Sequence, residues 1–175
     1  MLEHDVSEAL FEGLFARAVP RSTTLEVELR RLGYDLQHPL AGYPGPVFSA
    51  CLEAARVELF PTRPPDEGQR ALGLAFVNGF RETILGRVVT TALPILGPAR
   101  FFPRLPGRLA SLRRDASVVV EVKEHAATLT FTDPLPVAHF FAGVVEGALG
   151  LARASAPRVV VVVLPNGYRL EASWA

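Results

Sequence analysis

The sequence predicts an α+β fold, in which helices come first and a four-stranded antiparallel sheet in ββαββ order follows. Two valine-rich runs, Ser117–Glu124 and Arg158–Leu164, have the short length and β-branched composition of strands. A glycine-bearing apolar segment, Pro136–Ser155, separates the two runs and has the spacing of a helix. The first hundred residues instead place leucine and phenylalanine three and four positions apart, which is typical of amphipathic helices.

Each valine-rich run is followed by a partner strand across a short turn. The turn at 124–126 leads to a strand at 126–132, and Asn166-Gly167 leads to a strand at 168–174. Asn-Gly is a strong hairpin signal because both residues tolerate a positive φ. We expect two hairpins, with the continuous valines at 159–163 covered on both faces by helices or by a second subunit.

Capping residues and prolines divide the helical half. Ser7 is suited to begin the first helix and Ser22 or Thr23 the second, and Pro46 suits the first turn of a third. We expect these helices to pack their apolar stripes inward.

The longest helical signal runs from Asp66 to about Leu93, and Asn78-Gly79 is expected to bend or divide it. The prolines and glycines between 94 and 107 predict a short irregular connection to the sheet.

The length and the net charge of the chain limit the classes of protein to which it can belong. A chain of 175 residues is enough for one domain with a full core, so we expect a single α+β domain over 1–175, with a helical half at 1–110 and a sheet half at 115–175. The formal net charge is zero, with 18 basic and 18 acidic residues, which disfavours a general nucleic-acid binder. Hydrophobic residues make up 49% of the chain. That content fits a well-filled core, or a buried dimer surface, or an apolar cavity.

No segment predicts a membrane span, because no run of ~18 residues is apolar throughout. The N-terminal residues lack the apolar core of a signal peptide. The single cysteine, Cys51, cannot form an intrachain disulfide. We expect a cytoplasmic protein.

The chain carries no catalytic or metal-binding signature. The four histidines, His4, His38, His125 and His139, are far apart in sequence, and neither a nucleophile elbow nor a phosphate-binding loop is present. We therefore expect no enzymatic activity, no metal and no haem or other cofactor.

Two further patterns allow alternative interpretations. Gly143 and Gly147 form a Gly-x-x-x-Gly pair, which in a soluble chain predicts close helix packing. Five arginines without an intervening acid form a cluster between Arg100 and Arg114. This cluster is either an anion-binding patch or a set of solvated side chains that pair with acids elsewhere.

An apolar ligand site is expected between the Asp66–Leu93 helix and the Pro136–Ser155 helix. Large apolar side chains face this region from both helices, and one threonine and one histidine could orient a ligand; the candidate residues are Phe76, Phe80, Thr83, His139, Phe140 and Val144. The alternative is that these rings simply fill the core.

The whole chain resembles an uncharacterised family of myxobacterial paralogues of about this size. The residues that carry the resemblance are Phe11-Glu12-Gly13-Leu14-Phe15, Gly33-Tyr34-Asp35, Tyr43-Pro44, Leu72-Gly73, Gly79, Thr83, Gly86-Arg87, Tyr168 and Trp174. This family has no established activity.

More distantly, residues 70–175 resemble the ligand-binding fold of vinyl-reductase-type sensor domains, TRAPP small subunits and haem-NO-binding-associated domains. The resemblance rests on Gly79, on Phe140 and Gly143–Leu149, and on the order of the last elements. It implies a homodimeric, non-enzymatic ligand-binding or signalling module for an apolar small molecule, or a protein-interaction scaffold without a small ligand. The Tyr-x-Ser-x-Arg motif of haem-NO sensors and the cysteine cluster of metal-containing vinyl-reductase domains are absent.

Overall fold

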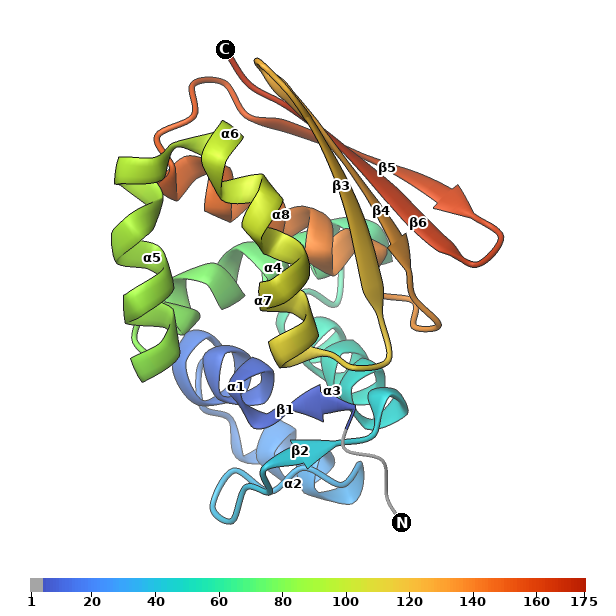
Figure 1. Ribbon diagram of the computed structural model, residues 1–175. Coiled ribbons are helices and arrows are strands. Elements are labelled where there is room, and N and C mark those ends of the chain that lie inside the picture. Colours follow the sequence, from blue (N-terminus) through green and yellow to red (C-terminus); the bar gives the residue numbers. More distant parts are fainter. Residues whose placement is uncertain (1–4) are drawn as a thin grey trace.

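The computed structural model describes residues 5–175, apart from the side chain of Leu85. Figure 1 shows the helices of the N-terminal half below and to the left, and a twisted sheet across the upper right with α8 against its inner face. The elements follow in the order β1 (Val6–Ser7), α1 (Glu8–Phe11), η1 (Glu12–Ala18), α2 (Thr23–Arg31), β2 (Gly42–Tyr43), α3 (Gly45–Leu59), α4 (Pro65–Phe80), α5 (Ile84–Leu96), α6 (Pro98–Phe101), η2 (Phe102–Arg104), α7 (Leu105–Leu112), β3 (Ser117–Lys123), β4 (Ala126–Thr132), α8 (Ala138–Leu151), β5 (Arg158–Leu164) and β6 (Gly167–Ser173).

The main sheet has four antiparallel strands in the order β3-β4-β6-β5. Val120 lies opposite Leu129 in the first hairpin, Val161 opposite Leu170 in the second, and Leu129 opposite Leu170 where the hairpins meet. Both predicted hairpins and the α+β class are therefore confirmed. The predicted set of strands is incomplete, because β1 and β2 form a second, two-stranded antiparallel sheet.

Among the described residues, no helix of this chain covers the outer face of the main sheet, so the expected cover of the valine run by helices on both faces is wrong. Cover of this face by a second subunit stays a prediction. β5 is an edge strand. On the outer face, Val160 of β5 is 39% exposed and Val119 of β3 is 67% exposed. The valine run is explained by β propensity rather than by burial on both faces. Arg70 on α4 donates a hydrogen bond to the Val159 carbonyl at 3.0 Å, which satisfies one backbone group of this edge.

Side-chain caps and prolines begin the first helices where the sequence predicts them. The Ser7 hydroxyl accepts from the Ala9 amide at 3.3 Å, and the Ser22 hydroxyl accepts from the Leu25 amide at 3.4 Å. Pro46 lies in the first turn of α3. These three predictions are confirmed.

The helical signal from Asp66 to Leu93 is divided, as expected, but not at Asn78-Gly79: α4 ends at Phe80 and α5 begins at Ile84. The division falls at Thr83, whose hydroxyl accepts from the Gly86 amide at 2.9 Å and donates to the Phe80 carbonyl at 2.8 Å. Gly79 lies inside α4 and does not end it. A Cβ at this position would lie 2.2 Å from the Gly13 carbonyl oxygen, so the glycine allows η1 to pack closely against α4.

The irregular connection predicted between 94 and 107 is also wrong. Pro98, Pro103 and Pro106 each lie in the first turn of a short helical element, namely α6, η2 and α7. Proline suits that position because its fixed φ is helical and its missing N–H has no partner in a first turn. The prolines therefore divide this segment into short helices and do not make it irregular.

One hydrophobic core runs through the helical and sheet halves. In the helical half it is built around the Phe11 ring, whose centroid lies 4.5 Å from that of Tyr43, 4.7 Å from Tyr34 and 5.4 Å from Phe48. Cys51 lies in the same core, and burial, with a smaller contribution from a distant carboxylate, raises the pKa of its thiol to about 12.

Candidate ligand cavity

An apolar cavity of about 120 Å³, partly open to solvent, lies between α5 and α7 on one side and α4 and α8 on the other. Its wall is made almost wholly of hydrocarbon; the lining residues are Leu10, Phe76, Val77, Phe80, Val89, Thr90, Leu93, Phe101, Leu105, Arg108, Leu109, Ser111, Leu112, Phe131, Phe141, Val144, Val145, Ala148 and Leu151. We call this space the apolar cavity.

Glycines set the position of the α4–α8 wall. A Cβ at Gly73 would lie 2.0 Å from the Phe140 carbonyl oxygen, and a Cβ at Gly143 would lie 2.1 Å from that of Arg70. Gly147 is in similar close contact with Val77. The close packing predicted for Gly143 and Gly147 is confirmed. Since the two helices touch, the open space lies beside the α4–α8 pair and not between the two helices.

Aromatic rings form the floor of the apolar cavity. Phe76 and Phe80 stack with their centroids 5.3 Å apart, and Phe131 and Phe141 lie 5.7 Å apart. Aromatic side chains offer a large apolar area with little freedom to collapse into a neighbouring void. This helps to keep the space open.

The polar groups on the wall are few and already engaged. The Thr90 hydroxyl donates to the Gly86 carbonyl at 2.8 Å, and the Ser111 hydroxyl donates to the Arg108 carbonyl at 2.7 Å. Among the described residues of the wall, Arg108 is the one charged group, and its side chain belongs to an exposed residue. The wall therefore offers apolar contact and no described acid or base.

The α5 side is the wall best suited to move. Val89, Thr90 and Leu93 face the apolar cavity from α5, and Pro94 lies inside this helix. Proline has no N–H to donate to the carbonyl one turn earlier, which weakens the helix at that turn.

The predicted site residues divide into two groups. Phe76, Phe80 and Val144 line the apolar cavity. Three others do not, and each has another role in the structure. Thr83 caps α5, Phe140 is fully buried with its ring 5.8 Å from both Phe48 and Phe76, and His139 lies 3.3 Å from Asp66 near the surface.

Sequence reasoning missed the α5 and α7 sides of the apolar cavity. Val89, Leu93, Leu105 and Leu109 have the spacing of ordinary core residues, and only the path of the chain through α6 brings them opposite Phe80. A usable signal was the high apolar content of α5, which exceeds what one buried face of a helix needs.

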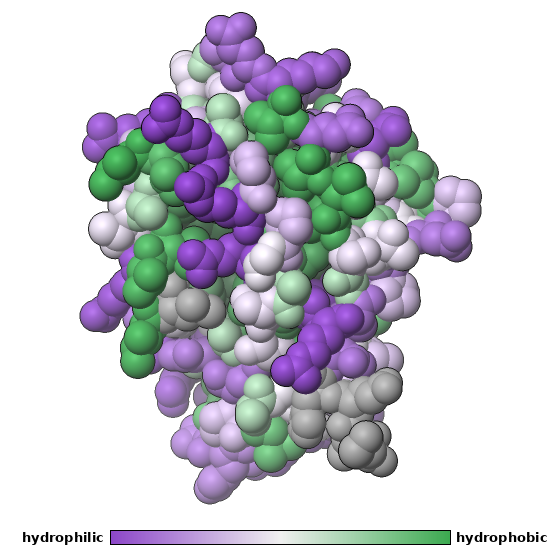
Figure 2. Space-filling model, in the orientation of Figure 1, coloured by the Kyte–Doolittle hydropathy of each residue, from purple (hydrophilic) through white to green (hydrophobic). Residues whose placement is uncertain are grey.

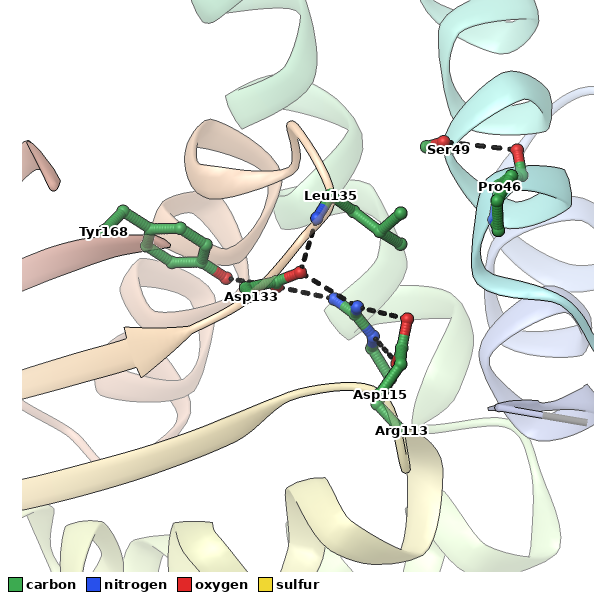
Figure 3. A network of polar contacts seen from close by, with 7 residues as sticks. All are labelled: Pro46, Ser49, Arg113, Asp115, Asp133, Leu135 and Tyr168. Carbon is green, nitrogen blue, oxygen red and sulfur yellow. Dashed lines mark hydrogen bonds and ion pairs between the residues drawn. The ribbon is translucent and has the colours of Figure 1, made fainter. Parts of the chain in front are cut away.

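A second buried cluster joins the two halves of the chain. Arg113 at the end of α7 donates to Asp115 at 2.8 and 2.9 Å and to Asp133 at 2.7 and 2.9 Å. Asp133 also accepts from the Tyr168 hydroxyl at 3.2 Å and from the Leu135 amide at 2.9 Å. Figure 3 shows Arg113 between its two carboxylates, with Tyr168 on the far side of Asp133.

This cluster is satisfied and holds the fold together. Burial lowers the pKa of the Arg113 guanidinium, but the hydrogen bonds that it donates to Asp115 and Asp133 outweigh burial and raise that pKa above its ordinary value. Burial, together with the Asp133 charge, raises the pKa of Tyr168 well above its ordinary value. The Arg113 guanidinium is paired with both carboxylates, and Asp133 is held by three donors. We interpret the cluster as structural.

The described residues do not bring metal-ligating side chains together: none of their His, Cys, Asp and Glu side chains form a group of three or more. His38 and His125 are exposed and lie beside Asp35 and Glu124. His4 lies outside the described residues.

The fold defined by these elements is that of H-NOX proteins. The chain is similar to the S. oneidensis H-NOX protein in its Fe(II)NO state, with a TM-score of 0.69 and 12% identity, covering 97% of this chain and 99% of that one. It is also similar to the Fe(II) unliganded H-NOX protein from K. algicida, with a TM-score of 0.65 and 11% identity over 97% and 96% of the two chains. A third similar structure concerns haem redox potential and porphyrin distortion, with a TM-score of 0.60 and 12% identity over 93% and 92%.

By sequence the chain belongs to a family described as a protein of unknown function, DUF2378, whose model matches residues 4–174. The expected uncharacterised family is thereby confirmed. No curated protein matches the sequence significantly. The similar structures are H-NOX proteins rather than vinyl-reductase or TRAPP domains, which corrects the more distant resemblance.

The residues around the apolar cavity do not fit haem. No histidine, cysteine, tyrosine or methionine stands on the described wall, so no axial ligand of the usual kinds is available there. The volume of about 120 Å³ is also well below the ~300 Å³ at which ordinary cofactor pockets begin. The described wall of the apolar cavity therefore supplies neither the usual ligand nor the volume for haem.

Proposed function

We propose that this protein is a non-enzymatic sensor module that binds a small apolar molecule, about the size of one ring, in the apolar cavity. The observation that carries the proposal is a partly enclosed space of about 120 Å³ with a hydrocarbon wall. An apolar cavity of ~150 Å³ in another protein stays dry and binds benzene or xenon. The size and chemistry here support the same class of ligand.

The absence of an acid or base on the described wall supports binding without catalysis. Arg108 is permanently charged, and the hydroxyls of Thr90 and Ser111 are held by backbone carbonyls. General acid–base chemistry needs a group that exchanges a proton near neutral pH.

The position of α5 supports a sensing role. A ligand in contact with Val89 and Leu93 would favour one position of α5 over another by its difference in affinity for the two. The similar H-NOX structures include one that is an oxygen complex of a domain related to soluble guanylate cyclases. From this similarity we infer only that a protein with this fold can hold a small ligand.

Ligand-induced thermal shift tests the proposal. Toluene, phenol and indole are added to the purified protein, and native mass spectrometry of the same preparation reports any ligand that is carried along. We expect toluene to raise the melting temperature, because it fills the space without leaving a polar group unpaired.

Two leucine variants localise the effect. Ala148→Leu places a larger side chain into the apolar cavity, and Ala110→Leu adds the same side chain on the exposed side of α7. The shift should disappear in the first variant and persist in the second. If no apolar compound shifts the wild type and no ligand is carried along, the ligand proposal fails, and a protein-interaction scaffold takes its place.

A further inference from the structure

The outer side of α5 carries an apolar stripe. Ile84, Val88 and Ile95 are 88%, 66% and 82% exposed. Their spacing of four and seven residues places them on one side of the helix, while Val89 and Leu93 face the apolar cavity. Exposed apolar side chains that line up in this way mark an interaction surface more often than scattered ones do. We call these three residues the α5 stripe.

Arginines border the α5 stripe. No acidic residue occurs from Thr83 to Arg114, and the exposed cations in this segment that lie on α5, α6, η2 and α7 are Arg87, Arg100, Arg104 and Arg108. None of the four pairs with a carboxylate of the described residues, and Arg104 donates instead to the Arg100 carbonyl. We call these four residues the arginine border.

Figure 2 shows hydrophobic and strongly hydrophilic side chains side by side on one face of the molecule. Hydrophobic side chains run down the left edge over α5, and strongly hydrophilic side chains lie next to them over α6 and α7. The arginines of the predicted cluster thus lie in two different environments. Arg113 is buried between acids, whereas Arg100, Arg104 and Arg108 are exposed without a carboxylate partner among the described residues.

We propose that the α5 stripe and the arginine border dock on the surface of an anionic phospholipid bilayer, with α5 parallel to the membrane plane. Guanidinium groups bind phosphate oxygens with strong, often bidentate, hydrogen bonds. Apolar side chains on the same face enter the boundary between headgroups and acyl chains. None of the described helices is long and apolar enough to cross a bilayer, so this contact is interfacial.

The shape of the surface favours a membrane over a protein partner. The α5 stripe is a single line of three side chains on a helix of 13 residues, about 20 Å long. A stable protein interface needs about 800 Å² from each partner, usually with a packed centre. A second copy of the chain placed on this face would also bring two arginine borders together, which like-charge repulsion opposes.

Vesicle co-sedimentation of the full chain tests the proposal. We expect binding to vesicles of phosphatidylcholine with phosphatidylglycerol, weaker binding to phosphatidylcholine alone, and a decrease with added salt. Each arginine near an anionic surface contributes about fivefold to partitioning. Arg100→Gln with Arg104→Gln should therefore lower binding about 25-fold. Ile84→Ser with Ile95→Ser should lower it at least as far.

The controls are Val163→Ser and Arg158→Gln, which change an exposed valine and an exposed arginine on β5. Both should leave vesicle binding unchanged, and all variants should keep the wild-type melting temperature because every altered side chain is exposed. The proposal is overturned by equal binding to both kinds of vesicle, or by loss of binding in the controls. It is likewise overturned if the protein binds neither kind of vesicle; loss of self-association or of acidic-peptide binding in the Ile84→Ser, Ile95→Ser variant would then assign this face to a protein partner.

Discussion

Replacing Ala148 by leucine should stabilise the protein, because the new side chain enters the apolar cavity. At ~24 cal/mol per Å³, an empty space of about 120 Å³ costs about 3 kcal/mol of stability. Leucine adds three carbons, worth about 2.4 kcal/mol at ~0.8 kcal/mol each. Fixing its rotamer opposes this by ~0.5–1 kcal/mol. We expect a net gain of about 1.5 kcal/mol.

Urea unfolding of the wild type, Ala148→Leu and Ala110→Leu measures this gain. The exposed control should change the free energy of unfolding by less than about 0.5 kcal/mol. A well-packed site behaves in the opposite way, since extra methylenes in a full core cost ~1–3 kcal/mol. A loss of that size in Ala148→Leu would refute the reasoning, because it would mean that the space near Ala148 is not usable volume.

The remaining predictions concern the core, the buried cluster, the thiol and the assembly. Phe140→Ala should cost ~3–5 kcal/mol of unfolding free energy, whereas Phe80→Ala should cost only ~1.5–3 kcal/mol because its ring already borders an open space; equal losses would count against the apolar cavity. Arg113→Met should cost ~3–5 kcal/mol by chemical denaturation, since two buried carboxylates lose their cation, while Arg114→Met, on the exposed neighbour, should cost little. Cys51, with its pKa raised to about 12, should resist a thiol reagent at about pH 8 until the protein unfolds, and rapid stoichiometric labelling of the native protein would contradict this. Sedimentation at micromolar concentration should show a species of twice 19.0 kDa if the homodimer expected from the sequence forms, and a monomer alone would exclude it.

Local signals were sufficient for the sheet half. The Asn166-Gly167 turn and the β-branched runs specify hairpins without reference to the rest of the chain. Likewise, the spacing of Gly143 and Gly147 predicts a close contact between helices. The five consecutive valines of β5 led to the prediction of cover on both faces, because such a run has the same composition on an edge strand as on a buried strand.

Tertiary packing determines the end of α4 and the strands β1 and β2, which local sequence signals do not predict. Asn78-Gly79 looks like a helix break, but Gly79 stays helical where η1 packs against it, and the break falls at Thr83, where a hydroxyl caps the next helix. β1 and β2 have two residues each, too few for any periodic pattern to appear.

The candidate site was predictable only in part for the same reason. Phe76, Phe80 and Val144 belong to helices that were recognised, so their inward faces could be proposed. Their opposite wall comes from α5 and α7, and its distance from α4 depends on three short helices begun by prolines. Arg113 resembles its neighbouring arginines in sequence, and its partner Asp133 lies twenty residues later.

A crystal of the protein soaked with iodobenzene tests the ligand cavity most directly, because the anomalous signal of iodine locates the bound ring without a model of its chemistry. We expect one strong iodine peak inside the apolar cavity, in contact with Phe80, Val89 and Leu109. Peaks confined to the surface, with side chains filling the space between α5 and α8, would contradict the proposed ligand site.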